Sequence, residues 1–211
     1  MEKNKIAKLL MGLKCVQISM KTPFNYASGL KGPIYCDNRK VISHVDARSQ
    51  VVDAFLEKIK KSGIKFDSVA GLATAGIPHA AWIADKLGLP MIYVRGKAKE
   101  HGKKNQIEGD YFPGDKVIVI EDLVNQGSSL ENAVIALKEA GLETAACFCI
   151  VSYQMKTVEK LLEKLGVSLF SLTDFSSILD ISKEFLKLSE GDVSDLLEWQ
   201  KNPESWSIKR G

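Results

Sequence analysis

The chain of 211 residues has none of the long runs or dense clusters that identify several classes of protein. No apolar run approaches the roughly 18 residues that a membrane-spanning helix needs. The net charge of +3 is too small to indicate nucleic acid as the main partner. The apolar part of residues 1–11 is too short for a secretory signal peptide and is typical of an amphipathic helix. We therefore expect an ordinary globular protein.

Cysteine is also scarce, with only Cys15, Cys36, Cys147 and Cys149. Cys147 and Cys149 form one C-x-C pair inside an apolar stretch, and no second pair accompanies them. This spacing does not match the common zinc motifs. We expect reduced thiols in a cytoplasmic protein.

The composition that is present suits one packed domain. The hydrophobic fraction is 45% and the charged fraction is 26%, and both are ordinary for a globular protein. A chain of this length fits one α/β domain and buries a sizeable core. Because no internal repeat or low-complexity linker divides it, we expect a single domain over residues 1–211.

Segments with strand and helix patterns alternate along the chain. Buried strands are predicted at residues 68–71, 91–94, 117–120, 145–151 and 167–172. Helices are predicted at residues 46–62, 78–87, 130–140 and 157–165, and the remainder after residue 172 is mostly helical. This alternation predicts a doubly wound, mainly parallel sheet flanked by helices.

Residues 117–129, VIVIEDLVNQGSS, are the most informative segment. Their four β-branched residues predict a strand that is buried on both faces, and Glu121 and Asp122 stand where it is expected to end. The polar, glycine-containing turn at 123–129 leads into a predicted helix. Main-chain N–H groups and the dipole at a helix N-terminus favour phosphate, while carboxylates suit hydroxyl groups or a metal ion. The segment predicts a site for a phosphorylated sugar.

A second turn, residues 72–77, also joins a predicted strand to a predicted helix. Ligands of open α/β sheets bind outside the carboxyl ends of the strands, so both turns are candidates. Taken alone, the small residues of this turn are equally typical of a tight connection without a ligand.

The segment 96–114 is polar and has no apolar periodicity. In and beside it, a group of cations surrounds one histidine: Arg95, Lys97, Lys99, His101, Lys103 and Lys104. Loops of this length in compact domains are usually lids or binding loops. A cationic lid suits a polyphosphate, and His101 suits a proton donor or a phosphate ligand.

Together these features resemble the type I phosphoribosyltransferases. Residues 117–129 are similar to the phosphoribosyl-diphosphate signature of that superfamily. Within it, the chain is most similar to the orotate phosphoribosyltransferases. Residues 24–39 resemble their N-terminal hood, residues 95–102 their mobile catalytic loop, and residues 199–206 a C-terminal signature of a bacterial subgroup. The resemblance covers nearly the whole chain.

The resemblance implies a type I phosphoribosyltransferase fold, with a central, mainly parallel sheet flanked by helices and a small hood. The hood would comprise residues of about 14–40 plus the C-terminal segment, and the core residues of about 45–175. The implied reaction transfers the 5-phosphoribosyl group from 5-phosphoribosyl 1-diphosphate to N1 of orotate. Its products are orotidine 5′-phosphate and diphosphate, in the biosynthesis of UMP. The implied cofactor is Mg²⁺, carried by the substrate with Asp122 as a possible ligand.

The resemblance also assigns roles to particular residues. Glu121 and Asp122 would bind the ribose hydroxyls, and residues 125–129 the 5′-phosphate. The full set expected to bind phosphoribosyl diphosphate is Thr74, Ala75, Arg95, Lys99, His101, Glu121, Asp122, Leu123, Val124, Asn125, Gln126, Gly127, Ser128 and Ser129. The expected catalytic residues are Arg95, Lys99 and His101, and the expected orotate contacts are Ser28, Tyr35 and Asn125. Asn125 and Gln126 stand where most members have Thr or Ser followed by Thr. The mobile loop would reach the neighbouring site of a homodimer.

Two alternatives stay open at this point, and a third does not. The chain is also compatible with a phosphoribosyltransferase for another base, against which the hood segment argues. A non-catalytic regulator that binds phosphoribosyl diphosphate would need a nucleic-acid-binding module, and no extra basic domain is visible. A P-loop is excluded because Lys104 stands where that motif requires Ser or Thr.

Overall fold

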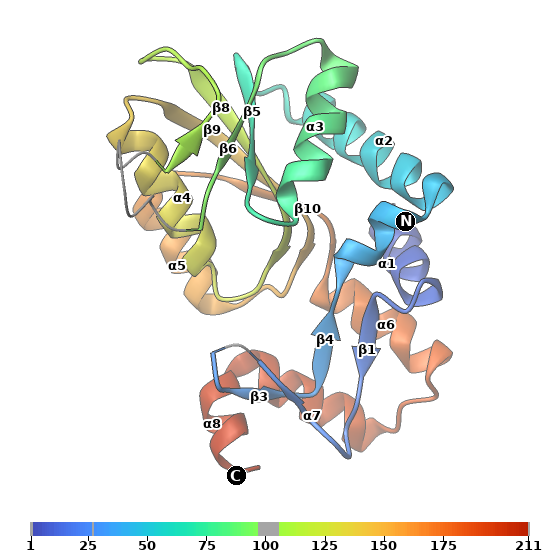
Figure 1. Cartoon of the computed structure of the whole chain (residues 1–211). Coiled ribbons are helices and arrows are strands. Elements are labelled where there is room, and N and C mark those ends of the chain that lie inside the picture. Colours follow the sequence, from blue (N-terminus) through green and yellow to red (C-terminus); the bar gives the residue numbers. More distant parts are fainter. Residues whose placement is uncertain (1, 27, 97–105, 211) are drawn as a thin grey trace.

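The structure, a computed structural model, describes residues 2–26, 28–96 and 106–210. Its centre is a six-stranded sheet in the order β10-β9-β8-β5-β6-β7 (Figure 1). The strands are β5 (Ser68–Leu72), β6 (Met91–Val94), β7 (Ile107–Glu108), β8 (Lys116–Val124), β9 (Glu143–Ser152) and β10 (Leu169–Asp174). All neighbouring pairs are parallel except β6 and β7. The predicted mainly parallel sheet is confirmed.

Helices cover both faces of this sheet. They are α1 (Glu2–Gly12), α2 (Val45–Ser62), α3 (Gly76–Leu87), α4 (Ser128–Glu139), α5 (Lys156–Leu165), α6 (Phe175–Phe185), α7 (Glu190–Lys201) and α8 (Pro203–Ile208), with the 3₁₀ helix η1 (Asn38–Ser43) before α2. Figure 1 shows α2 and α3 on one face and α4 and α5 on the other. The predicted amphipathic N-terminal helix is α1, whose buried side packs on β10 and α6.

Burial explains the positions of the central strands. All residues of β5 are buried, as are most of those of β8 and β9. Such continuous burial is typical of parallel strands with helices on both faces. Helix α2 buries Val51, Val52, Phe55 and Ile59 against the sheet and ends at Gly63, which has a φ of +67°. A left-handed residue at that position is a common helix stop, and glycine adopts it without strain.

Several predicted boundaries are wrong, and neighbouring elements explain the largest error. Strand β8 extends to Val124, so Glu121 and Asp122 lie inside the strand and not after it. Because β8 lies between β5 and β9, its ladder with β9 continues past the apolar run, and Glu121 pairs with Cys149. Likewise, the segment 96–114 contains the short strand β7, which pairs with β6. Helix α3 begins at Gly76, two residues before the expected Pro78.

Residues 16–36 form two small antiparallel sheets outside the main sheet. One pairs β1 (Val16–Ile18) with β4 (Ile34–Cys36), and the other pairs β2 (Phe24–Asn25) with β3 (Lys31–Gly32). In Figure 1, β3 lies beside α7 and α8, whereas β1 and β4 lie closer to α1 and α6. The main-chain N–H of Lys31 donates to Ser207 Oγ at 2.8 Å, and Trp199 and Trp206 are fully buried. The tryptophans of the 199–206 segment are therefore interior residues that help to join the hood to the C-terminal helices. The division into one hood and one core stays a prediction.

Two further observations bear on the expectations from composition. In the described ranges, no helix combines the length and the apolarity needed to cross a bilayer. All four cysteines are free, and three of them are buried.

Candidate functional site

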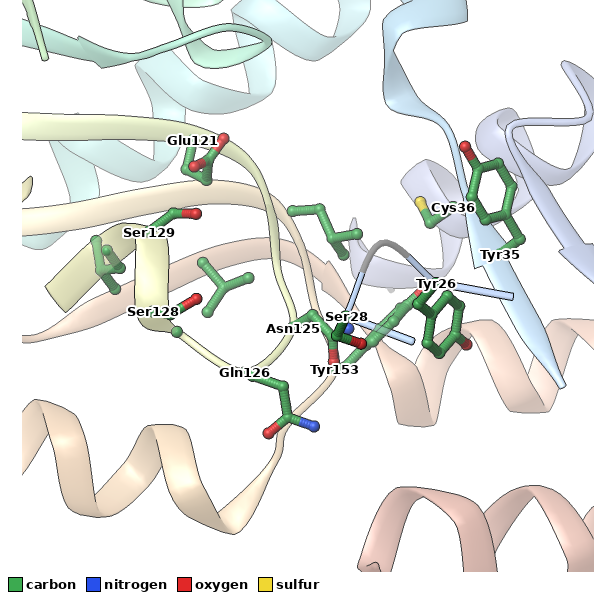
Figure 2. Close-up of a pocket in the computed structure, with 14 residues that line it drawn as sticks. Tyr26, Ser28, Tyr35, Cys36, Glu121, Asn125, Gln126, Ser128, Ser129 and Tyr153 are labelled. Atoms are coloured by element: carbon green, nitrogen blue, oxygen red, sulfur yellow. The ribbon is translucent and has the colours of Figure 1, made fainter. Parts of the chain in front are cut away.

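A cavity of about 300 Å³ opens between the hood and the carboxyl end of β8 (Figure 2). Its walls come from three parts of the chain that are far apart in sequence. The lining residues are Tyr26, Ser28, Tyr35, Cys36, Glu121, Leu123, Val124, Asn125, Gln126, Gly127, Ser128, Ser129, Leu130 and Tyr153. The structure thus brings the three residues predicted to contact orotate together with most of those predicted for the ribose phosphate.

The turn between β8 and α4 forms one wall of this cavity. Gly127 is the N-cap of α4 and has a φ of +83°. A Cβ at this position would lie 2.9 Å from Leu161 Cδ2, so only glycine fits without strain or movement. Because the first N–H groups of a helix lack partners within the helix, the start of α4 presents donors to an anion, and Ser128 and Ser129 add hydroxyl groups.

The two residues that depart from the family pattern have different surroundings. The exposed side chain of Gln126 accepts a hydrogen bond from Thr157 Oγ1 at 3.1 Å, so it turns toward α5 and does not fill the turn between β8 and α4. Asn125 is half-buried, and its Oδ1 has no hydrogen-bond partner among the described residues. Its amide is therefore available to a ligand in the cavity.

The acidic pair of β8 is only partly exposed to water. The side chain of Glu121 is buried, and its Oε1 accepts a hydrogen bond from the main-chain N–H of Asp122 at 2.8 Å. Burial raises the pKa of the Glu121 carboxyl well above its ordinary value, and the adjoining Asp122 raises it further. The fully buried Asn38 donates from Nδ2 to the main-chain oxygen of Asp122 at 2.9 Å. The end of the predicted hood segment is thus bonded directly to the acidic end of β8.

The raised pKa of Glu121 has a consequence for stability. Between the ordinary glutamate pKa of about 4.5 and the raised value, the folded state holds a proton that the unfolded chain has lost. Glu121 therefore lowers the free energy of unfolding progressively as the pH rises through this range. We expect Glu121→Gln to melt at a higher temperature than the wild type at pH 8 without substrate, and the difference to shrink toward pH 4.5. Thermal unfolding across this pH range checks it; a variant that is less stable at pH 8 contradicts it.

A smaller cavity of about 50 Å³ adjoins the first one at Ser129, which lines both. The turn after β5, the end of β6 and helix α4 form its walls. Its lining residues are Leu72, Ala73, Val94, Arg95, Gly96, Gln106, Ser129, Asn132 and Ala133. Arg95 Nη1 lies 3.3 Å from Glu108 Oε1, so this predicted catalytic cation is partly neutralised here. The peptide bond between Ala73 and Thr74 is cis.

The turn after β5 makes a close contact with β8. An added Cβ on Gly76 would lie 2.3 Å from the main-chain oxygen of Ile120. The small residue at this position is thus required for the second turn to lie against the strand that carries the acidic pair. Thr74 and Ala75, which were predicted to contact the diphosphate, belong to this turn.

Two of the three predicted catalytic residues, Lys99 and His101, lie outside the described residues, as does the rest of segment 97–105. Their assigned roles stay predictions. Within the described ranges, no group of three or more His, Cys, Asp or Glu side chains is arranged to hold a metal ion.

Four lining residues were missed by the sequence analysis: Tyr26, Cys36, Leu130 and Tyr153. Tyr26 and Cys36 lie within the segment compared with the hood, but nothing local marks them as facing a ligand. Tyr153 directly follows β9. The rule that ligands bind at the carboxyl ends of parallel strands, applied to this strand as well, would have indicated it.

Comparison with known proteins agrees with this geometry. The family model of the phosphoribosyl transferase domain matches residues 39–179. Orotate phosphoribosyltransferases from Coxiella burnetii and Listeria monocytogenes are 43% and 45% identical to the chain over 203 residues, covering 96% of it and 97% of each relative. The crystal structure of orotate phosphoribosyltransferase from Aeropyrum pernix is similar with a TM-score of 0.73 at 30% identity, over 83% of this chain and 97% of that one. The chain therefore belongs to the orotate phosphoribosyltransferase family, with the type I phosphoribosyltransferase fold that its sequence predicted.

Proposed function

We propose that this protein transfers the 5-phosphoribosyl group from phosphoribosyl diphosphate to N1 of orotate, and so acts as a pentosyltransferase in pyrimidine biosynthesis. The observation that carries the proposal is the pair of adjoining cavities that meet at Ser129. One cavity is large enough for a base and a ribose phosphate under the hood. The other lies beside the turn after β5, where a diphosphate leaving group would lie.

The ribose-phosphate half of the site uses the β8–α4 region. The N–H groups at the start of α4 and the hydroxyls of Ser128 and Ser129 would bind the 5′-phosphate. Glu121 and Asp122 would accept hydrogen bonds from the ribose hydroxyls. A buried carboxyl such as Glu121 is a stronger acceptor once a ligand brings donors to it. We expect Glu121→Gln to lower kcat/KM for phosphoribosyl diphosphate by about tenfold or more, because hydrogen bonds to charged groups are worth roughly 1.5–3 kcal/mol.

The diphosphate half of the site depends on positive charge. As the glycosidic bond breaks, positive charge develops at C1 of the ribose and negative charge on the departing oxygens. Arg95, Lys99 and His101 would stabilise those oxygens, which is electrostatic catalysis. Mg²⁺ bound by the substrate, with Asp122 as the nearest carboxylate, would supply further positive charge. The half-buried Asp122 fits such a role because its side chain takes part in no ion pair among the described residues.

The part of the large cavity beneath the hood would hold the base. Ser28 and Tyr35 would contact orotate from the hood, and Asn125 from the end of β8. Since orotate is already an anion, the reaction requires little base catalysis. The geometry needs only to hold N1 against C1 of the ribose while the diphosphate departs.

A direct assay tests the proposed activity. We expect the purified protein to consume orotate, followed by its ultraviolet absorbance, only when phosphoribosyl diphosphate and Mg²⁺ are both present. Adenine, guanine and hypoxanthine, supplied separately, serve as matched acceptors. Turnover of a purine without turnover of orotate, or binding of phosphoribosyl diphosphate without any turnover, contradicts the proposal.

Two properties of the working enzyme extend the proposal. We place it in the cytoplasm, since four free cysteines suit a reducing compartment. We also propose a homodimer, in which the segment 97–105 of one protomer completes the site of its partner. A molar mass in solution of one chain, about 23 kDa, under conditions of full activity would contradict the dimer.

A further inference from the structure

The hairpin formed by β2 and β3, the hood hairpin, is too short to maintain its own shape. Its strands, Phe24–Asn25 and Lys31–Gly32, form a sheet with no third strand among the described residues. An isolated two-stranded hairpin is marginally stable at best in water. Yet Tyr26 and Ser28, which lie between these strands, line the large cavity. The position of this wall of the cavity therefore depends on contacts outside the hairpin.

Helix α8 supplies such contacts. Figure 1 shows this helix beside β3. The main-chain N–H of Lys31 donates to Ser207 Oγ at 2.8 Å, and Lys31 Nζ donates to the main-chain oxygen of Arg210 at 3.1 Å. Because α8 has only six residues, and helices of this length are not stable alone, it also needs support from the rest of the protein.

Asp195 of α7 provides that support. Trp206 Nε1 donates to Asp195 Oδ1 at 2.9 Å, and Arg210 Nη2 donates to the same oxygen. The guanidinium group of Arg210 also lies over the Trp206 ring, with Cζ 3.9 Å from the ring centroid. Trp206 is fully buried and the Asp195 side chain is 19% exposed, so water and salt screen this ion pair only in part. One carboxylate thus binds two residues of the C-terminal segment, through hydrogen bonds that its charge strengthens.

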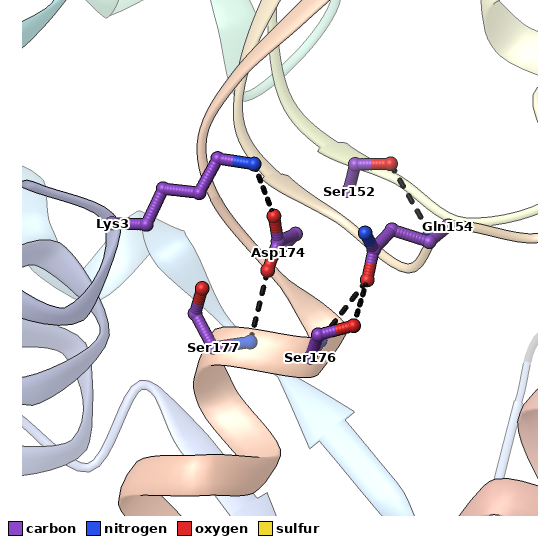
Figure 3. Close-up of polar contacts among 6 residues, drawn as sticks. All are labelled: Lys3, Ser152, Gln154, Asp174, Ser176 and Ser177. Carbon is purple, nitrogen blue, oxygen red and sulfur yellow. Dashed lines mark hydrogen bonds and ion pairs between the residues drawn. The ribbon is translucent and has the colours of Figure 1, made fainter. Parts of the chain in front are cut away.

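Helix α7 is in turn bonded to the core at the end of β9. Gln200 Nε2 donates to the main-chain oxygens of Tyr153 at 3.0 Å and of Gln154 at 3.3 Å. Gln154 is itself fixed to the start of α6, because its Oε1 accepts from Ser176 N at 3.0 Å and from Ser176 Oγ at 2.7 Å (Figure 3). Contacts therefore run from the core through α7 and α8 to the hood hairpin.

The same helix α7 packs against both walls of the cavity. The fully buried ring of Trp199 has its centroid 5.5 Å from that of Tyr153 on the core side and 6.4 Å from that of Tyr26 on the hood side. Both tyrosines line the cavity. Asp195 lies four residues before Trp199, and residues at this spacing share one face of a helix. One face of α7 thus sets the position of the hood wall relative to the core wall.

We propose that Asp195 is a positioning residue that, through α8, holds the hood hairpin over the base and so sets the affinity for orotate. This inference rests on the proposed function. Asp195 is not among the described residues that line either cavity, so it acts without touching a substrate. A released hairpin would have to be ordered each time the base binds, and the affinity falls by the cost of that ordering. The proposed 5′-phosphate site at the start of α4 does not involve the hairpin, so its affinity stays the same.

Steady-state kinetics of two Asp195 variants test the inference. Asp195→Ala removes the acceptor for both Trp206 and Arg210, whereas Asp195→Asn keeps an oxygen for Trp206 and removes only the charge. We expect KM for orotate to rise at least about tenfold in Asp195→Ala and at least about threefold in Asp195→Asn, while KM for phosphoribosyl diphosphate changes less than about twofold. Rates are measured well below the melting temperature of each variant.

Asp180→Asn is the matched control, because Asp180 forms an exposed ion pair with Lys183 inside α6. It should leave both KM values unchanged. If Asp195→Ala does not fold, the nearly isosteric Asp195→Asn decides the outcome alone.

Each other outcome counts against the inference. An orotate KM within about twofold of wild type in Asp195→Asn overturns it while the proposed function stands. An equal rise of both KM values, or the same rise in Asp180→Asn, also overturns it, because a general loss of structure then explains the effect. A wild-type protein that fails to use orotate removes the proposed function and this inference together.

Discussion

Replacing Lys99 with alanine is expected to lower kcat at least about 100-fold. In the proposed reaction this lysine stabilises the negative charge that develops on the departing diphosphate, and removal of one preorganised donor typically costs a factor of about 10²–10³ in kcat. KM for orotate should change little, since the base binds at the other end of the site. Initial rates with saturating orotate and phosphoribosyl diphosphate measure the effect.

The control for Lys99→Ala is Lys138→Ala, which removes the same charge from an exposed position in the last turn of α4. It should keep nearly full turnover. A Lys99→Ala enzyme that retains more than about a third of wild-type turnover would remove Lys99 from its catalytic role. Adding an alkylammonium ion to the medium and recovering part of the rate would support the role of the missing charge.

Gly76→Ala is expected to cause the largest structural effect of any single methyl group in the site. The new Cβ would lie 2.3 Å from the main-chain oxygen of Ile120. Because this oxygen belongs to the main chain of a central strand, it cannot rotate away to relieve the clash. Overpacking of this kind costs about 3 kcal/mol, which corresponds to a fall in melting temperature of roughly 6–12 °C for a chain of this size.

Activity should fall further than stability alone explains. A shift of the turn after β5 moves Thr74 and Ala75 from their positions beside the second cavity and presses on the strand that carries Glu121. Gly12→Ala is the matched control, because nothing lies within 4 Å of a Cβ at Gly12. Calorimetry and initial rates of both variants test this prediction. A Gly76→Ala protein that is as stable and as active as Gly12→Ala would contradict the close contact between Gly76 and Ile120.

Glu121 shows how a site can lower the stability of the fold that holds it. The carboxyl lies buried in a central strand because the sheet continues past the apolar residues of β8. The same burial that raises its pKa makes its charged form unfavourable in the free protein. When the carboxylate is buried it loses its hydrogen bonds to water, and the hydroxyls of a bound ribose would replace them. Glu121→Gln is therefore expected to be more stable and less active.

Much of the fold was predictable because its signals are local. Consecutive residues carry the alternation of buried strands and amphipathic helices, the helix stop at Gly63 and the presence of a turn before α4, although that turn is shorter than the predicted 123–129. The strand at 91–94 was predicted with its observed bounds. The end of β8 was not, because pairing with β9 on its far side continues the ladder through residues that look polar in sequence.

The residues of the site likewise fall into those that the sequence indicates and those that only the tertiary structure reveals. The sequence by itself determined the family, the acidic pair and the small-residue turns, since each is a short segment whose residue types and spacing carry the chemistry. Only the tertiary structure decided that Asn38 bonds to the main chain of Asp122, that Gln126 turns away toward Thr157, and that Tyr153 completes the cavity. The physical reason is that these contacts join residues separated by tens of positions. Their distances depend on how the strands order themselves and on how the C-terminal helices pack, and no local pattern of residues records either.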